Sequence, residues 1–363
     1  MINNTSITST LKIKTDRQTR RRQVVLFILV IFLISSIWNG LLNGSSNASF
    51  THLIHVLLTQ DWAISSKTFD YLIFIEIRLP RILLGLFVGA ALAVSGVLMQ
   101  GLFRNPLADP GIVGVSAGAS LGAVLAIVVG ITFPPLLSPF LELYKVIIGA
   151  FLGGLLSTIT LYALATRRSG TSIAVMLLAG IALSALSSAI VGILIFIAND
   201  QQLRDINFWH LGSLAGATWL KVWLIFPFIC VGFLFAPFLS HALNALALGE
   251  AIASHIGFQI QKVKNIAILL VALMCGGAVA VSGGIGFIGI VVPHILRLLI
   301  GSDHRYLIPS AALLGAALLI FADTFARLMI APAELPIGIV TALFGAPFFL
   351  WILISQRGVN FHD

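Results

Sequence analysis

The stretch that decides the fold is "ILLGLFVGAALAVSGVLMQG", residues 82–101. It contains no ionisable side chain, and an α-helix of about 20 residues is long enough to cross the ~30 Å hydrocarbon core of a bilayer. A membrane β-strand would be about half as long and would alternate apolar with polar residues, which this stretch does not do. The sequence therefore predicts a transmembrane α-helix here.

Apolar runs of this kind recur along the whole chain. Of the 363 residues, 59% are hydrophobic and 9% are charged, and the mean hydropathy is +1.06, whereas soluble domains carry about 25% charged residues. We therefore predict an all-α integral membrane protein of about ten transmembrane helices, forming a single domain over residues 23–363. The predicted spans are residues 24–43, 82–101, 113–132, 145–166, 173–198, 219–239, 264–283, 286–300, 307–331 and 336–355.

The distribution of charge predicts how the chain is oriented. A basic tail, residues 1–22, precedes the first span and contains "RQTRRR" at residues 17–22. Basic residues gather on the cytoplasmic side of membrane proteins, so the tail is predicted to be cytoplasmic, and an even number of spans returns the C-terminus to the same side. The predicted location is the cytoplasmic (inner) membrane of a bacterium. Topology and lipid contact account for the net charge of +8, and no nucleic-acid partner is implied.

The sequence lacks the motifs of an enzyme. There is no G-x-x-x-x-G-K-[ST] phosphate loop, no H-E-x-x-H and no C-x-x-C, so we predict neither ATP hydrolysis nor metalloprotease chemistry. We therefore predict no catalytic, cofactor-binding or metal-binding residues in this chain. A secondary active transporter is the alternative of a different class, but it would require ionisable groups at mid-span, and the spans offer little beyond Asp323.

Three glycines have the spacing of a nucleotide-binding motif. Gly284, Gly286 and Gly289 have the spacing G-x-G-x-x-G, which binds a dinucleotide only between a soluble strand and a helix, with an acidic residue about 20 positions further on. No soluble strand precedes these glycines, and the nearest acidic candidate, Asp303, lies in a predicted cytoplasmic turn. Together with Gly283, these residues are predicted to mark a reversal between the seventh span and a short eighth span, where missing side chains let backbones pack closely.

A short internal repeat links the two halves of the chain. "ALAVSG" at residues 91–96 returns as "AVAVSG" at residues 278–283. Five spans separate the copies, so they are predicted to run in opposite directions, which is the inverted-repeat architecture of many transporters.

Four long motifs are distinctive: "IRLPRILLGLFVGAALAVSGVLMQGLFRNPLADPGIVGVSAGAS" (77–120), "LALGEAIASHIGF" (246–258), "GGIGFIGIVVPHILRLLIGSDHR" (283–305) and "FADTFARLMIAPAELPIGIVTALFGAPFFLWIL" (321–353). Together they resemble one family, the membrane permeases of ABC importers for iron siderophores, haem and cobalamin. The resemblance implies a type II importer permease that works as a homodimer. Two cytoplasmic ATPase subunits would use ATP-Mg, and a periplasmic or lipid-anchored binding protein would deliver the substrate.

The resemblance implies that Arg78, Arg81 and Arg327 pair with acidic residues of the docked binding protein. Arg78 and Arg81 flank Pro80 at the outer mouth, where guanidinium groups suit bidentate contact with carboxylates. The alternative is that these side chains anchor the helices at the membrane edge. Asp323 precedes Arg327 by one helical turn and is predicted to pair with it.

The cytoplasmic loop at residues 240–263 resembles the coupling helices that contact the ATPase. It is amphipathic and too short to span, so one or two short helices at the membrane surface are predicted. The alternative is a plain interfacial helix. The residues that match the coupling motif are Leu248, Gly249, Glu250, Ala253 and Gly257.

Asn105, Leu107, Thr171 and Ser172 match positions that close the cytoplasmic gate in this family. "NPLADPG", residues 105–111, also reads as a helix-breaking turn, because its prolines lack a backbone donor and its Asn and Asp side chains can satisfy neighbouring amides. Both interpretations stay open.

The substrate is predicted from residues 201–219, "QQLRDINFWHLGSLAGATW". A short helix at the outer mouth would present Arg204, Phe208 and Trp209, and an arginine near aromatic faces suits a flat anionic macrocycle. The sequence looks most like haem permeases, with ferric siderophore and cobalamin as the alternative substrates. The tryptophans could equally anchor the helix at the interface.

Overall fold

The computed structural model describes residues 4–44, 48–59, 69–130, 138–167, 170–331 and 333–357. These residues are almost entirely helical, with one two-stranded antiparallel hairpin. The helices are α1 (Asn4–Leu42), α2 (Phe50–Thr59), α4 (Phe69–Tyr71), the π-helical η1 (Leu72–Arg78), α5 (Leu79–Phe103), the 3-10 turn η2 (Pro110–Val113), α6 (Val115–Val128), α7 (Ser138–Ala165), α8 (Ile173–Ile197), α9 (Asp200–Leu211), α10 (Trp219–Phe235), the 3-10 turn η3 (Ala236–Leu239), α11 (Ser240–Leu246), α12 (Glu250–His255), α13 (Ile260–Ser282), α14 (Ile288–Ile300), α15 (His304–Met329) and α16 (Ile337–Arg357); the strands are β1 (Thr166–Arg167) and β2 (Gly170–Thr171).

Every predicted span coincides with a helix. Within the described ranges, seven helical segments are long and apolar enough to cross a membrane, and α6, α14 and α16 supply three shorter apolar helices. The all-α membrane architecture is therefore confirmed. α6 is short because Pro110 and a left-handed Gly114 delay its start, and α14 begins only at Ile288, directly after Phe287, whose backbone is left-handed.

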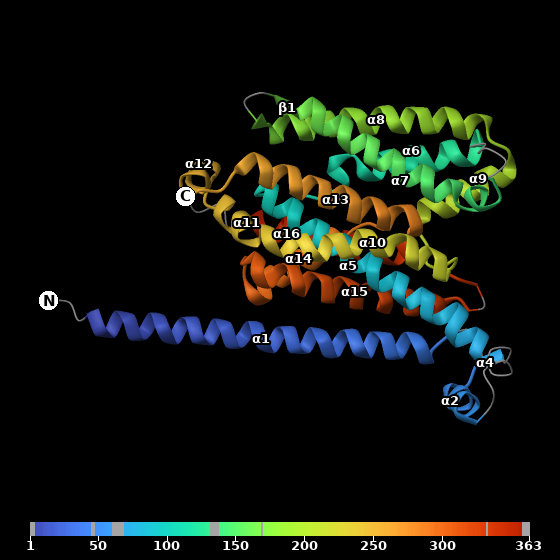
Figure 1. Cartoon of the computed structure of the whole chain (residues 1–363), viewed down its shortest axis with the longest axis horizontal. Coiled ribbons are helices and arrows are strands. Elements are labelled where there is room, and N and C mark those ends of the chain that lie inside the picture. Colours follow the sequence, from blue (N-terminus) through green and yellow to red (C-terminus); the bar gives the residue numbers. More distant parts are fainter. Residues whose placement is uncertain are drawn as a thin grey trace.

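The helices form one elongated bundle, which Figure 1 shows from the side. α5 runs through its centre and contacts α1, α10, α13, α14 and α15, while α6, α7 and α8 lie along one flank and α1 lies beside α15 along the other. α11, α12 and the hairpin lie at one end, here called the α12 end, and α9 lies at the opposite α9 end. The two repeat-bearing helices, α5 and α13, pack together in opposite directions, as the repeat predicts.

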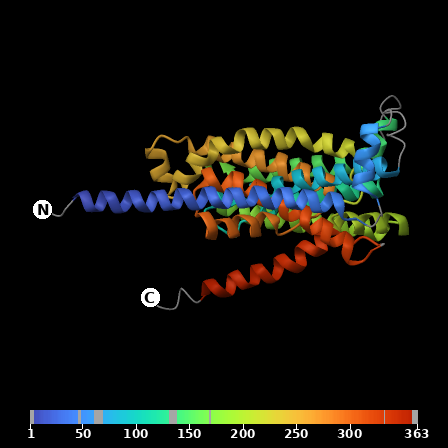
Figure 2. The same ribbon diagram turned by 90° about the horizontal axis from the view of Figure 1, so that it is seen from below.

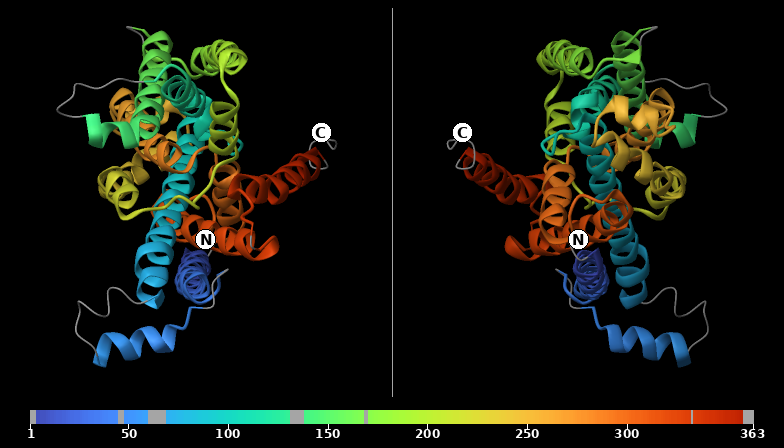
Figure 3. Two further views of the ribbon diagram at one scale, coloured as in Figure 1. Left: turned by 90° about the vertical axis from the view of Figure 1, so that its right-hand side faces the viewer. Right: turned by 90° about the vertical axis from the view of Figure 1, so that its left-hand side faces the viewer.

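α16 diverges from the rest of the bundle. Figures 2 and 3 show it leaving the body of the protein at an angle, and several of its large apolar side chains are exposed, among them Leu343, Phe344, Trp351 and Ile354. α16 therefore has an apolar face that no other element of the described residues covers.

Backbone contacts between helices replace side-chain packing at several glycines. Gly96 of α5 faces α14 so closely that a Cβ atom built on it would lie 1.9 Å from the carbonyl oxygen of Gly289. α6 and α7 cross in the same way, since a Cβ on Gly122 would lie 2.0 Å from the oxygen of Gly149. Small residues at these crossings let helices approach where apolar burial alone gives no preference over lipid.

The glycine-rich reversal is confirmed, with one correction. α13 ends at Ser282 and α14 begins at Ile288, and close backbone contact holds for Gly283, whose added Cβ would lie 2.2 Å from the oxygen of Trp209, and for Gly289. For Gly286 the expectation is wrong, because a Cβ there would meet nothing within 4 Å. Gly286 instead lines an open hollow.

The first helix begins earlier than predicted. α1 runs from Asn4, so most of the basic segment expected to precede the first helix belongs to it. Arg21 donates to the Leu298 oxygen and Arg22 to the Ile300 oxygen, at 3.3 Å each, and Arg22 also pairs with Asp303. These carbonyls are at the C-terminus of α14, where cations are favoured. The two arginines therefore hold α1 against the C-terminal end of α14, and α1 is helical through the basic segment.

Candidate functional site

Five charged side chains are gathered near the α9 end, and Arg81 is at their centre. Its Nε donates to both carboxylate oxygens of Asp323 at 3.2 and 2.9 Å, and its Nη2 donates to Oδ1 at 2.9 Å. Its Nη1 donates to both oxygens of Glu334 at 2.9 Å. Every nitrogen of this guanidinium therefore already has a carboxylate partner within the chain.

The other two arginines are buried beside it. Arg327 Nε lies 3.3 Å from an oxygen of Asp323, one helical turn away, which confirms the predicted pair, and Arg327 also donates to the Gly40 oxygen at 3.3 Å. Arg78 packs over the ring of Phe74 and donates to the Leu41 and Leu42 oxygens at the end of α1. All three arginines are at most 6% exposed.

The arrangement changes what docking through these arginines would require. The sequence led us to expect cations at the outer mouth, free to meet a partner's carboxylates, and the structure has them engaged inside the chain. Glu334 is the accessible member of the cluster, with its side chain 37% exposed. Sequence reasoning missed it; the signal was its position in the short connection between α15 and α16, beside the end of the helix that carries Arg327.

The segment predicted to meet the substrate forms α9, as expected. Asn199 and Gln202 cap its first turn reciprocally. Arg204 donates to Gln201 at 2.9 Å and Phe208 is exposed, while Trp209 is partly buried and its ring meets that of His210 edge to face. The three predicted residues thus share one short helix, but none of them lines the hollow beside it.

That hollow has a volume of about 630 Å³ and lies between α9, α16 and the glycine reversal. It is mainly apolar, and His210 is its one imidazole. Burial lowers the pKa of His210, which favours the neutral ring, and the ring lies 3.4 Å from the Ser120 hydroxyl. The residues that line it are His210, Leu211, Gly284, Gly286, Phe287, Gly338, Ile339, Ala342, Leu343, Ala346 and Pro347.

His210 and Phe287 are the residues of this hollow that the sequence analysis missed. His210 directly follows Trp209, so its position on α9 was available as a signal. Phe287 has a positive φ of 69°, a conformation that costs a non-glycine residue energy and tends to persist at functional sites. No sequence pattern announces that conformation.

At the α12 end, the predicted coupling residues form a compact surface element. α11 and α12 are two short helices, as the amphipathic pattern predicted. Leu248 is 63% exposed and Ala253 is fully buried. Gly249 and Gly257 bracket α12 with φ values of 117° and 104°, so both positions favour glycine for its backbone freedom.

The predicted gate residues lie in two connections at this same end. Asn105 accepts a hydrogen bond from the Leu107 amide at 2.9 Å, which confirms the helix-breaking turn after α5. Thr171 is buried in β2, and Ser172 caps the start of α8 by accepting from the Val175 amide at 3.4 Å. The turn and the cap are structural facts; the gating role stays a prediction.

Comparison with known proteins identifies the family. Residues 27–355 match the FecCD transport family. The chain is 45% identical over 335 residues to the hemin transport system permease protein HmuU of Yersinia pestis, which covers 91% of this chain and 95% of that protein. It is 42% identical over 281 residues to the cobalamin import system permease protein BtuC of Halobacterium salinarum, covering 77% of this chain and 73% of that protein.

A solved structure agrees with the sequence relatives. The inward-facing structure of a metal-chelate type ABC transporter superimposes with a TM-score of 0.78 at 32% identity, covering 92% of this chain and 99% of that chain. The family match over residues 27–355 includes α5, the glycine reversal and the α11–α12 element, so the resemblance read from the four motifs is confirmed. The chain belongs to the FecCD transport family.

Proposed function

We propose that the chain is the membrane permease subunit of an ATP-driven ABC importer and that it carries haem. The observation that carries the proposal is the 45% identity, over nearly the full length of both chains, to a hemin permease. The hollow beside α9 supports the substrate: it is apolar, contains the aromatic ring of Phe287, and offers the imidazole of His210, whose neutral form can accept a hydrogen bond or coordinate ferric iron.

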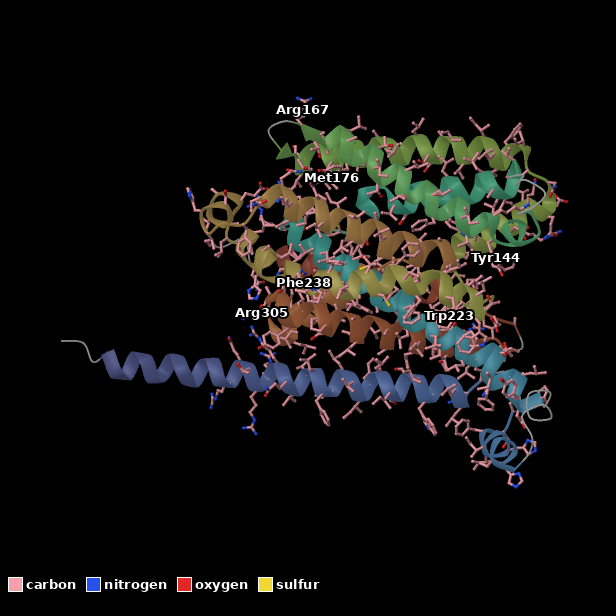
Figure 4. The ribbon with its side chains drawn as sticks, in the orientation of Figure 1. Tyr144, Arg167, Met176, Trp223, Phe238 and Arg305 are labelled. Carbon is pink, nitrogen blue, oxygen red and sulfur yellow. The ribbon has the colours of Figure 1, made fainter. Side chains whose placement is uncertain are left out.

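The α12 end is proposed to face the cytoplasm. Figure 4 places Arg167 and Arg305 at this end and Tyr144 and Trp223 toward the opposite one. The basic face of α1 also reaches the α12 end, where Arg22 meets Asp303. Asp303 has a pKa well below its ordinary value because the Arg305 side chain bonds to it. The excess of basic groups here follows the positive-inside rule, with both termini cytoplasmic.

The partners follow from the surfaces that the bundle presents. A second copy would cover the exposed apolar face of α16, since a lone helix with that face leaves its own bundle (Figure 2). Two ATPase subunits would bind ATP-Mg and receive α11 and α12, where Leu248 projects from the surface. A substrate-binding protein would dock at the α9 end, and this chain itself would neither hydrolyse ATP nor hold a cofactor.

Docking through Arg81 would require an exchange of carboxylates. Because Asp323 and Glu334 saturate the guanidinium, a carboxylate of the binding protein would have to take the place of Glu334, the more exposed of the two. We expect Glu334→Gln to tighten binding of the cognate binding protein about tenfold, because an amide holds Arg81 less strongly than a carboxylate by ~1.4 kcal/mol. Affinity measured on the permease in nanodiscs tests this.

Asp205→Asn is the matched control, since it removes an exposed acid of α9 at the same end. Its affinity for the binding protein should be that of the unaltered permease. Equal or weaker binding by the Glu334→Gln variant would show that docking does not draw on Arg81.

The substrate is tested by transport. The permease, purified with its ATPase partner and reconstituted in liposomes, should accumulate haemin delivered by the binding protein when ATP is supplied, and should not accumulate a ferric siderophore or cobalamin. His210→Ala should lower haemin uptake several-fold, whereas His55→Ala, an exposed imidazole on α2, should not. Preferred uptake of cobalamin or a ferric siderophore would reassign the substrate.

The mechanism is tested separately from the substrate. A secondary transporter would form no complex with an ATPase, and its uptake would collapse with an uncoupler at constant ATP. Either result, obtained on folded protein, would overturn the importer assignment.

A further inference from the structure

Lys264 is a buried lysine with all its hydrogen-bonding capacity in use. It lies in the second turn of α13 and its side chain is 7% exposed. The ammonium group lies 2.9 and 3.0 Å from the two carboxylate oxygens of Glu250, and it donates to the Thr171 carbonyl oxygen at 3.1 Å. An ammonium has three N–H donors, and three oxygens surround this one.

Those oxygens belong to two separate segments. Glu250 is the first residue of α12, in the predicted coupling element, and Thr171 ends β2, in the predicted gate connection. Lys264 therefore joins three parts of the chain that are up to 93 residues apart in sequence: α12, α13 and the hairpin.

Thr171 is held at every polar atom it has. Gln261, one turn before Lys264, accepts from the Thr171 amide at 3.0 Å and donates to its hydroxyl at 2.7 Å. The hydroxyl also meets that of Thr166 across the hairpin at 2.9 Å. With its carbonyl on Lys264, Thr171 cannot shift relative to α13 without breaking several hydrogen bonds.

Glu250 is held less tightly. Its side chain is 40% exposed, and a polar pocket of about 510 Å³ opens beside it. Arg167 from β1 and Tyr162 from α7 line the same pocket together with Gln261 and Lys264. The pocket leaves space on one side of the pair, so packed side chains do not block a displacement of α12 there.

We propose that Lys264 is the positioning residue that connects α12 to the hairpin. A displacement of α12 by a partner would be transmitted through the Glu250–Lys264 ion pair to the Thr171 backbone, and from there to Ser172, which caps α8. The inference rests on the proposed function, because it supposes that an ATPase moves α12 and that the hairpin borders the gate. The link itself depends only on the contacts above.

The test compares Lys264→Met with Lys262→Met. Methionine keeps an unbranched apolar side chain that reaches as far as the lysine Cε and removes the ammonium group with its donors. Lys262 is an exposed lysine in the first turn of the same helix. In liposomes containing the ATPase and binding protein, Lys264→Met should lower substrate transported per ATP hydrolysed by at least ~5-fold, a typical loss for a broken coupling between two sites. Lys262→Met should keep the ratio of the unaltered permease.

A distance measurement keeps the test independent of activity. Spin labels at the exposed positions Arg167 and Ile252 should move together when nucleotide is added to the unaltered complex, and the label on the hairpin should stop responding in Lys264→Met. Lys264→Arg should restore part of the response, since guanidinium retains the donors. Glu250→Gln combined with Lys264→Met should behave like Lys264→Met alone.

The outcomes separate the two proposals. If the unaltered complex shows no ATP-dependent transport, the proposed function fails. If it transports and Lys264→Met retains both its transport ratio and the hairpin response, the function stands and the link through Lys264 is wrong.

Discussion

Gly96→Ala is expected to prevent the permease from accumulating as folded protein. The methyl group would lie 1.9 Å from the carbonyl oxygen of Gly289, 2.6 Å from its carbonyl carbon and 2.8 Å from its Cα. All three obstacles are backbone atoms, so no rotamer change relieves them, and α5 and α14 would have to separate. Overpacking in a core costs about 1–3 kcal/mol when side chains can yield, and more when they cannot.

Separation at this point would spread through the centre of the bundle. α5 contacts α1, α10, α13, α14 and α15, and Gln100, one turn beyond Gly96, donates to the same Gly289 oxygen at 3.1 Å. A loss of several kcal/mol is a large share of the ~5–15 kcal/mol that holds a typical protein folded.

The matched control is Gly192→Ala in α8. It makes the same change in a helix interior, but a Cβ there meets nothing within 4 Å, so alanine should raise stability by up to ~1 kcal/mol through its helix propensity. Thermal unfolding in detergent, followed by size-exclusion chromatography, compares the two. A Gly96→Ala protein as stable as Gly192→Ala would show that α5 and α14 are not in backbone contact.

The contrast between Gly96 and Gly192 shows which part of the fold cannot be predicted from the sequence. Composition and run length sufficed to place the seven long apolar helices of the described residues and the three shorter ones, because the hydrophobic requirement of a bilayer is strong and depends on sequence position alone. Which glycine carries a crossing is a three-dimensional property. Gly96, Gly192 and Gly286 occur in similar apolar surroundings, yet one is in backbone contact and the others are not.

The candidate sites divide in the same way. The arginine cluster, the short coupling helices and the helix-breaking turn could be predicted from local sequence. In the structure the arginines lie near the α9 end, and the short helices and the turn lie at the α12 end. The sequence did not predict the roles of Glu334, Lys264 and His210. The residues that surround each of these three side chains come from segments distant in sequence. Lys264 looked like one more basic residue at the start of a span, and burial between Glu250 and Thr171 distinguishes it from Lys262.

Asp323→Asn is expected to destabilise the permease by about 3–5 kcal/mol, the cost of removing one partner from a buried ion pair. Asp323 accepts three hydrogen bonds from Arg81 and lies 3.3 Å from Arg327 Nε. Without its charge, Arg81 keeps Glu334 as a carboxylate partner, whereas Arg327 loses the carboxylate that it contacts. The amide nitrogen of asparagine also turns a donor toward other donors. Unfolding temperature measured in detergent should fall by several degrees.

Two comparisons separate lost charge from a merely altered side chain. Asp205→Asn makes the same substitution on exposed α9 and should leave the unfolding temperature unchanged within error. Asp323→Asn combined with Arg327→Met should be more stable than Asp323→Asn alone, since it removes one of the two buried cations that lose the Asp323 carboxylate. If Asp323→Asn unfolds at the temperature of Asp205→Asn, the charge of Asp323 does not hold the cluster together.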